Sequence, residues 1–133
     1  MNTETLIVLD DDQENAEIIE YYFKSHNFSV IKYTDPLQFL LDIDNGLKAK
    51  TLLLDIHMPK MDGFSLLDIM KQKYCDFFKS CNIIALTALA FDKDEERCLK
   101  AGADYYISKP FKLQYLVSFV RDLQPKNYIR DNE

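Results

Sequence analysis

The chain alternates between short apolar runs and longer segments in which apolar residues recur every three or four positions. Three of the short runs look continuously apolar, which is typical of strands covered on both faces of a sheet. The runs are rich in β-branched or aromatic residues and span 5–9, 28–33, 51–55, 82–87 and 104–109. The pattern predicts five strands.

Helical spacing fills the intervals between these runs. The positions that carry it are Ile19, Tyr22 and Phe23; Phe39, Leu40 and Ile43; Leu66, Leu67, Ile69 and Met70; Leu99; and Tyr115, Leu116, Phe119, Val120 and Leu123. Local signals agree, since Asp35 can cap a helix that begins at Pro36 and ends near Gly46. One helix therefore follows each strand.

Five strand–helix units in succession predict a doubly wound α/β fold. The alternation implies parallel pairing, right-handed crossovers and helices on both faces of a five-stranded sheet. A chain of 133 residues has room for one domain, because single domains commonly hold about 100–150 residues. We expect that domain to span 1–124 and a polar tail to span 125–133.

Composition narrows the possible functions. Hydrophobic residues make up 47% and charged residues 29%, as in ordinary globular proteins. The net charge is −6 and no basic stripe is present, which argues against direct nucleic-acid binding. Because no run approaches the roughly 18 apolar residues of a membrane span, and the amino-terminal segment lacks a basic region before its apolar run, we expect a cytoplasmic protein. Cys75, Cys81 and Cys98 lack metal-ligand spacing and are expected to be bystander thiols.

Polar residues follow four of the predicted strands at the point where each strand ends. Residues 10–12 are all Asp, Asp55 ends the third strand, Thr87 the fourth and Lys109 the fifth. In an open parallel sheet, ligands bind beyond the carboxyl ends of the strands, so these side chains are expected to share one edge.

The expected cluster of carboxylates needs a counter-charge. Two like charges about 4 Å apart repel by about 4 kcal/mol at an effective dielectric constant of about 20. Lys109 supplies one positive charge and a divalent ion two, which together balance Asp10, Asp11 and Asp55. Oxygen ligands select a hard cation, and few carboxylates with room for water suit Mg²⁺ better than Ca²⁺.

A carboxylate at a strand end beside Mg²⁺ can act as a nucleophile toward phosphorus. Asp55 would attack in line, while Thr87 and Lys109 hold the other phosphoryl oxygens. Each residue also has a simpler structural explanation: residues 10–12 as turn and capping residues, Asp55 as the start of a turn, Thr87 as a strand end and Lys109 as a loop residue. Because all of these residues are expected at the same edge of the sheet, we favour the phosphoryl-acceptor hypothesis over the separate structural explanations.

The motifs at these positions resemble the receiver domain of two-component response regulators, over about residues 4–124. They are LLLDIHMPKMDG (52–63), IVLDDDQEN (7–15), IIALTA (83–88) and YISKPF (106–111). The resemblance implies Asp55 as the phosphoacceptor, Asp10 and Asp11 as metal ligands, and Thr87 and Lys109 as the signalling Thr and the Lys of a Lys-Pro motif. It also implies a flavodoxin-like sheet with strand order 2-1-3-4-5.

Further roles follow from the same resemblance. The backbone carbonyl of His57 becomes a metal ligand, and Tyr106 the aromatic switch residue. Pro59 and Gly63 shape the loop after the third strand. His57 and Leu89 occupy two variable positions said to tune the lifetime of the phosphoryl group.

The function implied is a phosphoacceptor signalling domain rather than an enzyme. A phosphohistidine on a sensor histidine kinase or a histidine phosphotransfer protein donates to Asp55 with Mg²⁺, the domain supplies much of the catalysis, and the acyl phosphate later hydrolyses slowly. Thr87 then moves and Tyr106 fills the space, which changes binding of a downstream protein target at the face of the fourth helix, fifth strand and fifth helix. The domain is either a monomer or a phosphorylation-dependent dimer.

Three alternatives stay open. A phosphatase of the haloacid dehalogenase type would use Asp10 as nucleophile, but Glu14 replaces the usual Thr or Val and little chain is left for a substrate cap. A flavin-binding module needs a neutral loop after the first strand, whereas three aspartates repel phosphate. The third is a receiver-like module that binds partners without being phosphorylated.

Overall fold

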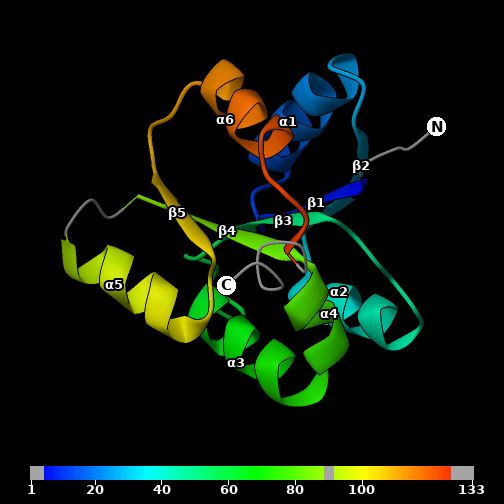
Figure 1. Ribbon diagram of the computed structural model, residues 1–133, viewed down its shortest axis with the longest axis vertical. Helices are drawn as coiled ribbons and strands as arrows, with labels where there is room; N and C mark the ends of the chain where they lie inside the picture. The colour runs from blue at the N-terminus through cyan, green and yellow to red at the C-terminus, as the bar shows by residue number, and fades with distance from the viewer. Residues whose placement is uncertain (1–4, 89–91, 127–133) are drawn as a thin grey trace.

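The computed structural model describes residues 5–88 and 92–126, with the backbone alone for residues 92–94 (Figure 1). Five parallel strands form one sheet in the order β2-β1-β3-β4-β5, which confirms the predicted fold class. The elements are β1 (Thr5–Leu9), α1 (Gln13–Ser25), β2 (Ser29–Tyr33), α2 (Pro36–Asp44), β3 (Thr51–Asp55), α3 (Gly63–Lys73), α4 (Cys75–Ser80), β4 (Asn82–Thr87), α5 (Asp92–Ala101), β5 (Tyr105–Ser108) and α6 (Leu113–Arg121).

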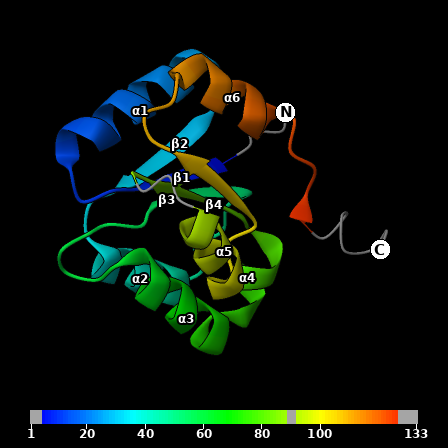
Figure 2. The same ribbon diagram turned by 90° about the vertical axis from the view of Figure 1, so that its left-hand side faces the viewer.

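Helices cover both faces of the sheet, so the molecule has two cores. Figure 2 shows α1 and α6 on one side of the sheet and α2, α3, α4 and α5 on the other. Along β1, Leu6 and Val8 face the first pair of helices, whereas Ile7 and Leu9 face the second group. The three inner strands are almost entirely buried, which explains why their sequences are continuously apolar.

The described residues form six helices instead of the five expected. The additional helix, α4, has only six residues and follows α3 after a single residue, Tyr74. It is too short for a helical period to appear in the sequence, and no side chain caps its start. Phe77 holds it in place by packing edge-on against Phe39 of α2, with 5.8 Å between ring centroids.

Aspartates start three of the helices that follow strands. The side chains of Asp12, Asp35 and Asp62 accept hydrogen bonds from backbone N–H groups in the first turns of α1, α2 and α3, at 3.2, 3.0 and 2.8 Å. Each cap satisfies a donor that the helix itself leaves unpaired. Asp12 is therefore a capping residue.

Gly63 allows α3 to begin very close to the end of β3. Its backbone N donates to the carbonyl of Ile56 at 2.8 Å, and a Cβ on this residue would lie 2.9 Å from the Ile56 Cα. Any larger residue would push the loop away from the sheet. The glycine thus holds the loop after Asp55 in a compact form.

The segment after α6 folds back onto the amino-terminal ends of β4 and β5. The division between a domain at 1–124 and a tail at 125–133 stays a prediction, but Lys126 is only 3% exposed. Its Nζ lies 2.9 Å from Asp104 Oδ2, and Asn82 donates to the carbonyl of Gln124 at 2.9 Å. Among the described residues, no helix has the length and apolar character to cross a membrane.

Candidate functional site

Three carboxylates meet where β1 and β3 end. Leu9 pairs with Leu54 in the parallel register, so Asp10 and Asp55 emerge side by side. Oxygen atoms of Asp10, Asp11 and Asp55 all lie within 4.8 Å of one another. Asp10 and Asp55 are 3% and 6% exposed, whereas Asp11 faces solvent. The structure therefore brings together the three predicted carboxylate ligands at the predicted edge.

Lys109 reaches the same cluster from the end of β5. Its Nζ lies 3.3 Å from Asp55 Oδ1, and its backbone N donates to the Thr87 carbonyl at 2.7 Å. The backbone bond fixes the lysine beside β4, and the side chain then crosses to β3. Three carboxylates and one ammonium leave an excess of two negative charges in this cluster.

The pKa of Asp10 reflects its burial beside another carboxylate. Burial, together with the nearby Asp55 carboxylate, raises the pKa of Asp10 to about 6, although the Asp12 N–H at 2.9 Å and the Lys109 ammonium oppose the rise. An all-oxygen donor set that is partly buried and overcharged fits a hard divalent cation such as Mg²⁺. We conclude that these residues are suited to hold a metal.

Thr87 lies one strand further along the sheet. It ends β4, is 1% exposed, and its Oγ1 lies 3.2 Å from Nε2 of the His57 imidazole. His57 arrives there because the pairing of β3 with β4 continues one residue past Asp55, with Ile56 N donating to the Leu86 carbonyl at 3.1 Å. Sequence reasoning gave His57 a backbone-carbonyl role and a place at a variable position, but it missed this side-chain contact with Thr87, which depends on strand register.

Tyr106 lies on β5 close to Thr87. It pairs with Ala85, two residues before Thr87 on β4, and packs half-buried against the core beneath α2–α5. The predicted signalling Thr and aromatic switch residue are thus neighbours in the sheet. Leu89, the second variable position, lies outside the described residues.

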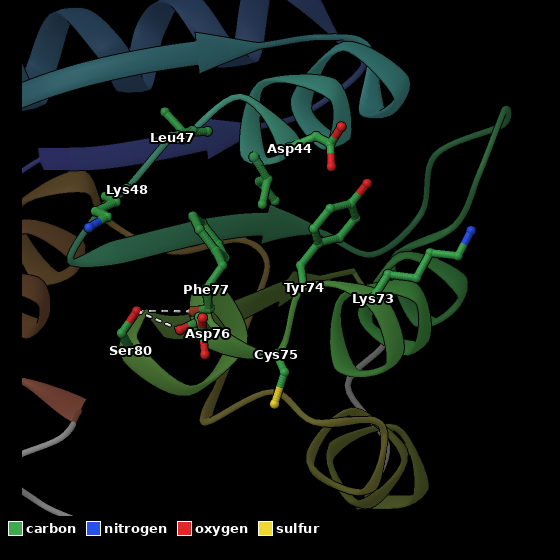
Figure 3. A pocket seen from close by; sticks show the side chains of 11 residues that line it. Asp44, Leu47, Lys48, Lys73, Tyr74, Cys75, Asp76, Phe77 and Ser80 are labelled. Atoms are coloured by element: carbon green, nitrogen blue, oxygen red, sulfur yellow. Dashed lines mark hydrogen bonds between the residues drawn. The ribbon is translucent and has the colours of Figure 1, made fainter.

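Two hollows in the surface differ in their relation to this cluster. One, of about 300 Å³, adjoins it and is lined by Asp10, Lys109, Ile18, Phe111 and Leu113, among others. Figure 3 shows the other, of about 680 Å³, where the rings of Tyr74 and Phe77 rise toward the segment that carries Asp44 and Leu47. Its lining includes none of the predicted site residues, so volume alone does not mark the chemistry.

Comparisons with known proteins identify relatives of the whole domain. A family model described as the response regulator receiver domain matches residues 6–121. The regulatory protein VanR of Enterococcus faecium is 30% identical over 119 residues, which cover 90% of this chain and 49% of VanR. The sensor histidine kinase CheAY of Helicobacter pylori is 32% identical over 117 residues, which cover 87% of this chain and 14% of CheAY. The chain spans about half the length of VanR and its relative VanRc.

Solved structures agree with these relatives. The receiver domain of the Francisella response regulator 1452 is 28% identical, with a TM-score of 0.77, and the match covers 90% of this chain and 94% of that one. The chemotaxis response regulator CheY4 of Vibrio cholerae has a TM-score of 0.80 at 18% identity, over 90% of this chain and 98% of that one, and supports the fold alone.

Proposed function

The chain belongs to the response regulator receiver domain family, and on that premise we propose that Asp55 accepts a phosphoryl group and thereby changes which protein the domain binds. One observation carries the proposal: Asp55 is buried at the end of a central strand, ion-paired with Lys109 at 3.3 Å and clustered with Asp10 and Asp11. A structural aspartate would need one counter-charge and no further carboxylates. This cluster instead suits an acceptor and a metal.

The proposed reaction transfers a phosphoryl group from a donor histidine to Asp55. An oxygen of Asp55 forms the new O–P bond, the N–P bond of a donor phosphohistidine breaks, and the leaving imidazole nitrogen takes up a proton. Lys109 and Thr87 hold the phosphoryl oxygens, which carry most of the charge. Asp10, Asp11, Asp55 and the His57 carbonyl would hold Mg²⁺, which would neutralise more of that charge. Water later cleaves the acyl phosphate and regenerates Asp55.

The donor is a phosphohistidine on a sensor histidine kinase or a histidine phosphotransfer protein. The hollow beside the acidic cluster supports this, because Ile18, Phe111 and Leu113 give it apolar walls next to Asp10 and Lys109. Ile18 is 53% exposed on α1 and lines this hollow, so a protein docked there would bury it. A donor protein packed there would bring its histidine to the open side of the cluster.

The output is a change in partner binding. The hydroxyl of Thr87 moves to a phosphoryl oxygen, and Tyr106, its neighbour on β5, follows into the vacated space. The surface of α5, β5 and α6 then differs between the two states. Leu99 and Tyr115 are large and exposed on that surface, which supports a protein target or a second copy of the domain as the partner.

Mass spectrometry after treatment with acetyl phosphate and Mg²⁺ tests the proposal. We expect one added phosphoryl group, located at Asp55 after borohydride reduction of the acyl phosphate. The matched control is Asp55→Asn, which should gain none. Modification at Asp10 would instead indicate a phosphatase of the haloacid dehalogenase type. Binding of Mg²⁺ without any modification would indicate a module that works unphosphorylated.

A further inference from the structure

The imidazole of His57 contacts the hydroxyl of Thr87 in a way that the phosphoacceptor chemistry does not require. The resemblance to receiver domains gives His57 a backbone carbonyl ligand, which any residue would provide, and a variable position said to tune the lifetime of the phosphoryl group, but it names no partner for the imidazole. The side chain, however, is exposed and turns back so that Nε2 lies 3.2 Å from Thr87 Oγ1. It thereby joins the second residue after β3 to the residue that ends β4.

The backbone around His57 is held on both sides. Ile56 is fully buried, donates to the Leu86 carbonyl at 3.1 Å and accepts from the Gly63 N–H at 2.8 Å. Met58, on the other side, is 5% exposed. Because both neighbours are buried in the core, His57 can follow a moving Thr87 only by rotating its own side chain.

We propose that His57 is a positioning residue that holds the Thr87 hydroxyl in the unphosphorylated state, and that this contact breaks when Thr87 binds the phosphoryl group. The inference rests on the proposed function. The contact stabilises only one of the two states, so it shifts the equilibrium between them toward the resting state. A hydrogen bond of ordinary net strength shifts such an equilibrium about two- to tenfold.

The geometry predicts how individual variants behave. His57→Leu removes the polar contact and keeps the backbone carbonyl, so the phosphorylated-like state becomes about two- to tenfold easier to reach. His57→Gln keeps a polar group that can reach Thr87, and its behaviour should lie closer to that of the natural protein. In a Thr87→Val background the hydroxyl that His57 contacts is absent. There, His57→Leu should not change the equilibrium between the two states any further.

A titration of the full chain with beryllofluoride, a phosphoryl mimic, at saturating Mg²⁺ tests this. The backbone amide resonance of Tyr106 in two-dimensional NMR reports the switched population, and thermal unfolding checks that each variant folds. We expect His57→Leu to lower the midpoint about two- to tenfold in the natural background, and the double-mutant cycle with Thr87→Val to show that this effect disappears.

The outcomes separate the inference from its premise. An unchanged midpoint in His57→Leu, or an equal shift in the Thr87→Val background, would overturn the role of His57 while leaving Asp55 as acceptor. If the natural protein itself shows no response to beryllofluoride and Mg²⁺, the proposed function fails and the inference fails with it.

Discussion

Two groups of charged side chains, each with buried members, lie at opposite edges of the same sheet, and they differ in how their charges are balanced. At the amino-terminal edge, Lys126 Nζ contacts Asp104 Oδ2 at 2.9 Å and donates to the carbonyls of Phe78 and Cys81 at 2.6 and 3.1 Å. Asp104 Oδ2 also accepts from the Ile83 N–H at 2.8 Å. One positive and one negative charge meet there, and all three donors of the ammonium have partners.

The carboxyl-terminal edge lacks this balance. Asp10, Asp11 and Asp55 face a single ammonium, Lys109, whose Nζ lies 3.3 Å from Asp55. Burial is the main reason that the pKa of Asp10 is raised, and the nearby Asp55 carboxylate adds to the rise. The balanced cluster meets its charge requirements within the fold, whereas the proposed function uses the unbalanced cluster to bind a cation and a phosphoryl group.

The largest expected effect comes from breaking the acceptor itself. Asp55→Asn keeps the shape of the side chain and removes its nucleophilic charge, so transfer of radiolabelled phosphoryl from an activated sensor kinase should be lost completely. Because the substitution also removes one of the crowded charges, the protein should remain folded in thermal unfolding. Undiminished labelling of this variant would refute Asp55 as the acceptor.

At the balanced cluster of Lys126 and Asp104, a substitution should change the free energy of unfolding instead of phosphoryl transfer. Lys126→Met leaves Asp104 without its partner and should lower the free energy of unfolding by about 2–4 kcal/mol, somewhat less than for a fully buried pair because Asp104 is partly exposed. Urea denaturation measures the change. Lys24→Met is the matched control, since it removes an exposed ion pair with Glu20 and should cost less than about 0.5 kcal/mol. If Lys126→Met and Lys24→Met lowered the free energy of unfolding equally, the buried ion pair of Lys126 would contribute no more than an exposed one.

Asp10→Asn should change stability and metal affinity in opposite directions. The pKa of Asp10 lies about 2 units above its ordinary value, so removing this charge should stabilise the metal-free protein by about 1–3 kcal/mol at neutral pH. Affinity for Mg²⁺ should fall, because one of its oxygen ligands loses its charge. Urea denaturation in a chelator and calorimetric titration with Mg²⁺ measure the two effects. If Asp10→Asn were less stable than the natural protein without metal, the carboxylate of Asp10 would not be destabilising the metal-free fold.

The smallest expected effect is the pH dependence of stability and of Mg²⁺ affinity that Asp10 gives to the carboxyl-terminal edge. The pKa of Asp10 is raised in the folded protein from 3.8 to about 6, so the folded state binds the extra proton between these values and the metal-free protein loses stability as pH rises through that window. Protons compete with Mg²⁺ below about pH 6, where affinity should fall by up to about tenfold per pH unit. Calorimetric titrations between pH 5 and 8 check this, and Asp10→Asn should flatten the profile.

The strands and some helix starts of this molecule could be predicted from the sequence, because they depend on residues that are close together in the chain. The continuously apolar inner strands and the Asp35 cap of α2 are visible in a few neighbouring residues of the sequence. The predicted site residues followed from topology, since parallel strands bring their carboxyl ends to one edge. Helix α4 was missed because its six residues are too few to show a helical period in the sequence.

The sequence by itself determined the strand–helix order, the parallel sheet and the gathering of Asp10, Asp55, Thr87 and Lys109, because strand order and alternation dictate which residues share an edge. Only the tertiary structure decided that His57 contacts Thr87 and that Lys126 is buried against Asp104. These pairs are separated by 30 and 22 residues, and which side chains meet over such distances depends on strand register and on the packing of the helices.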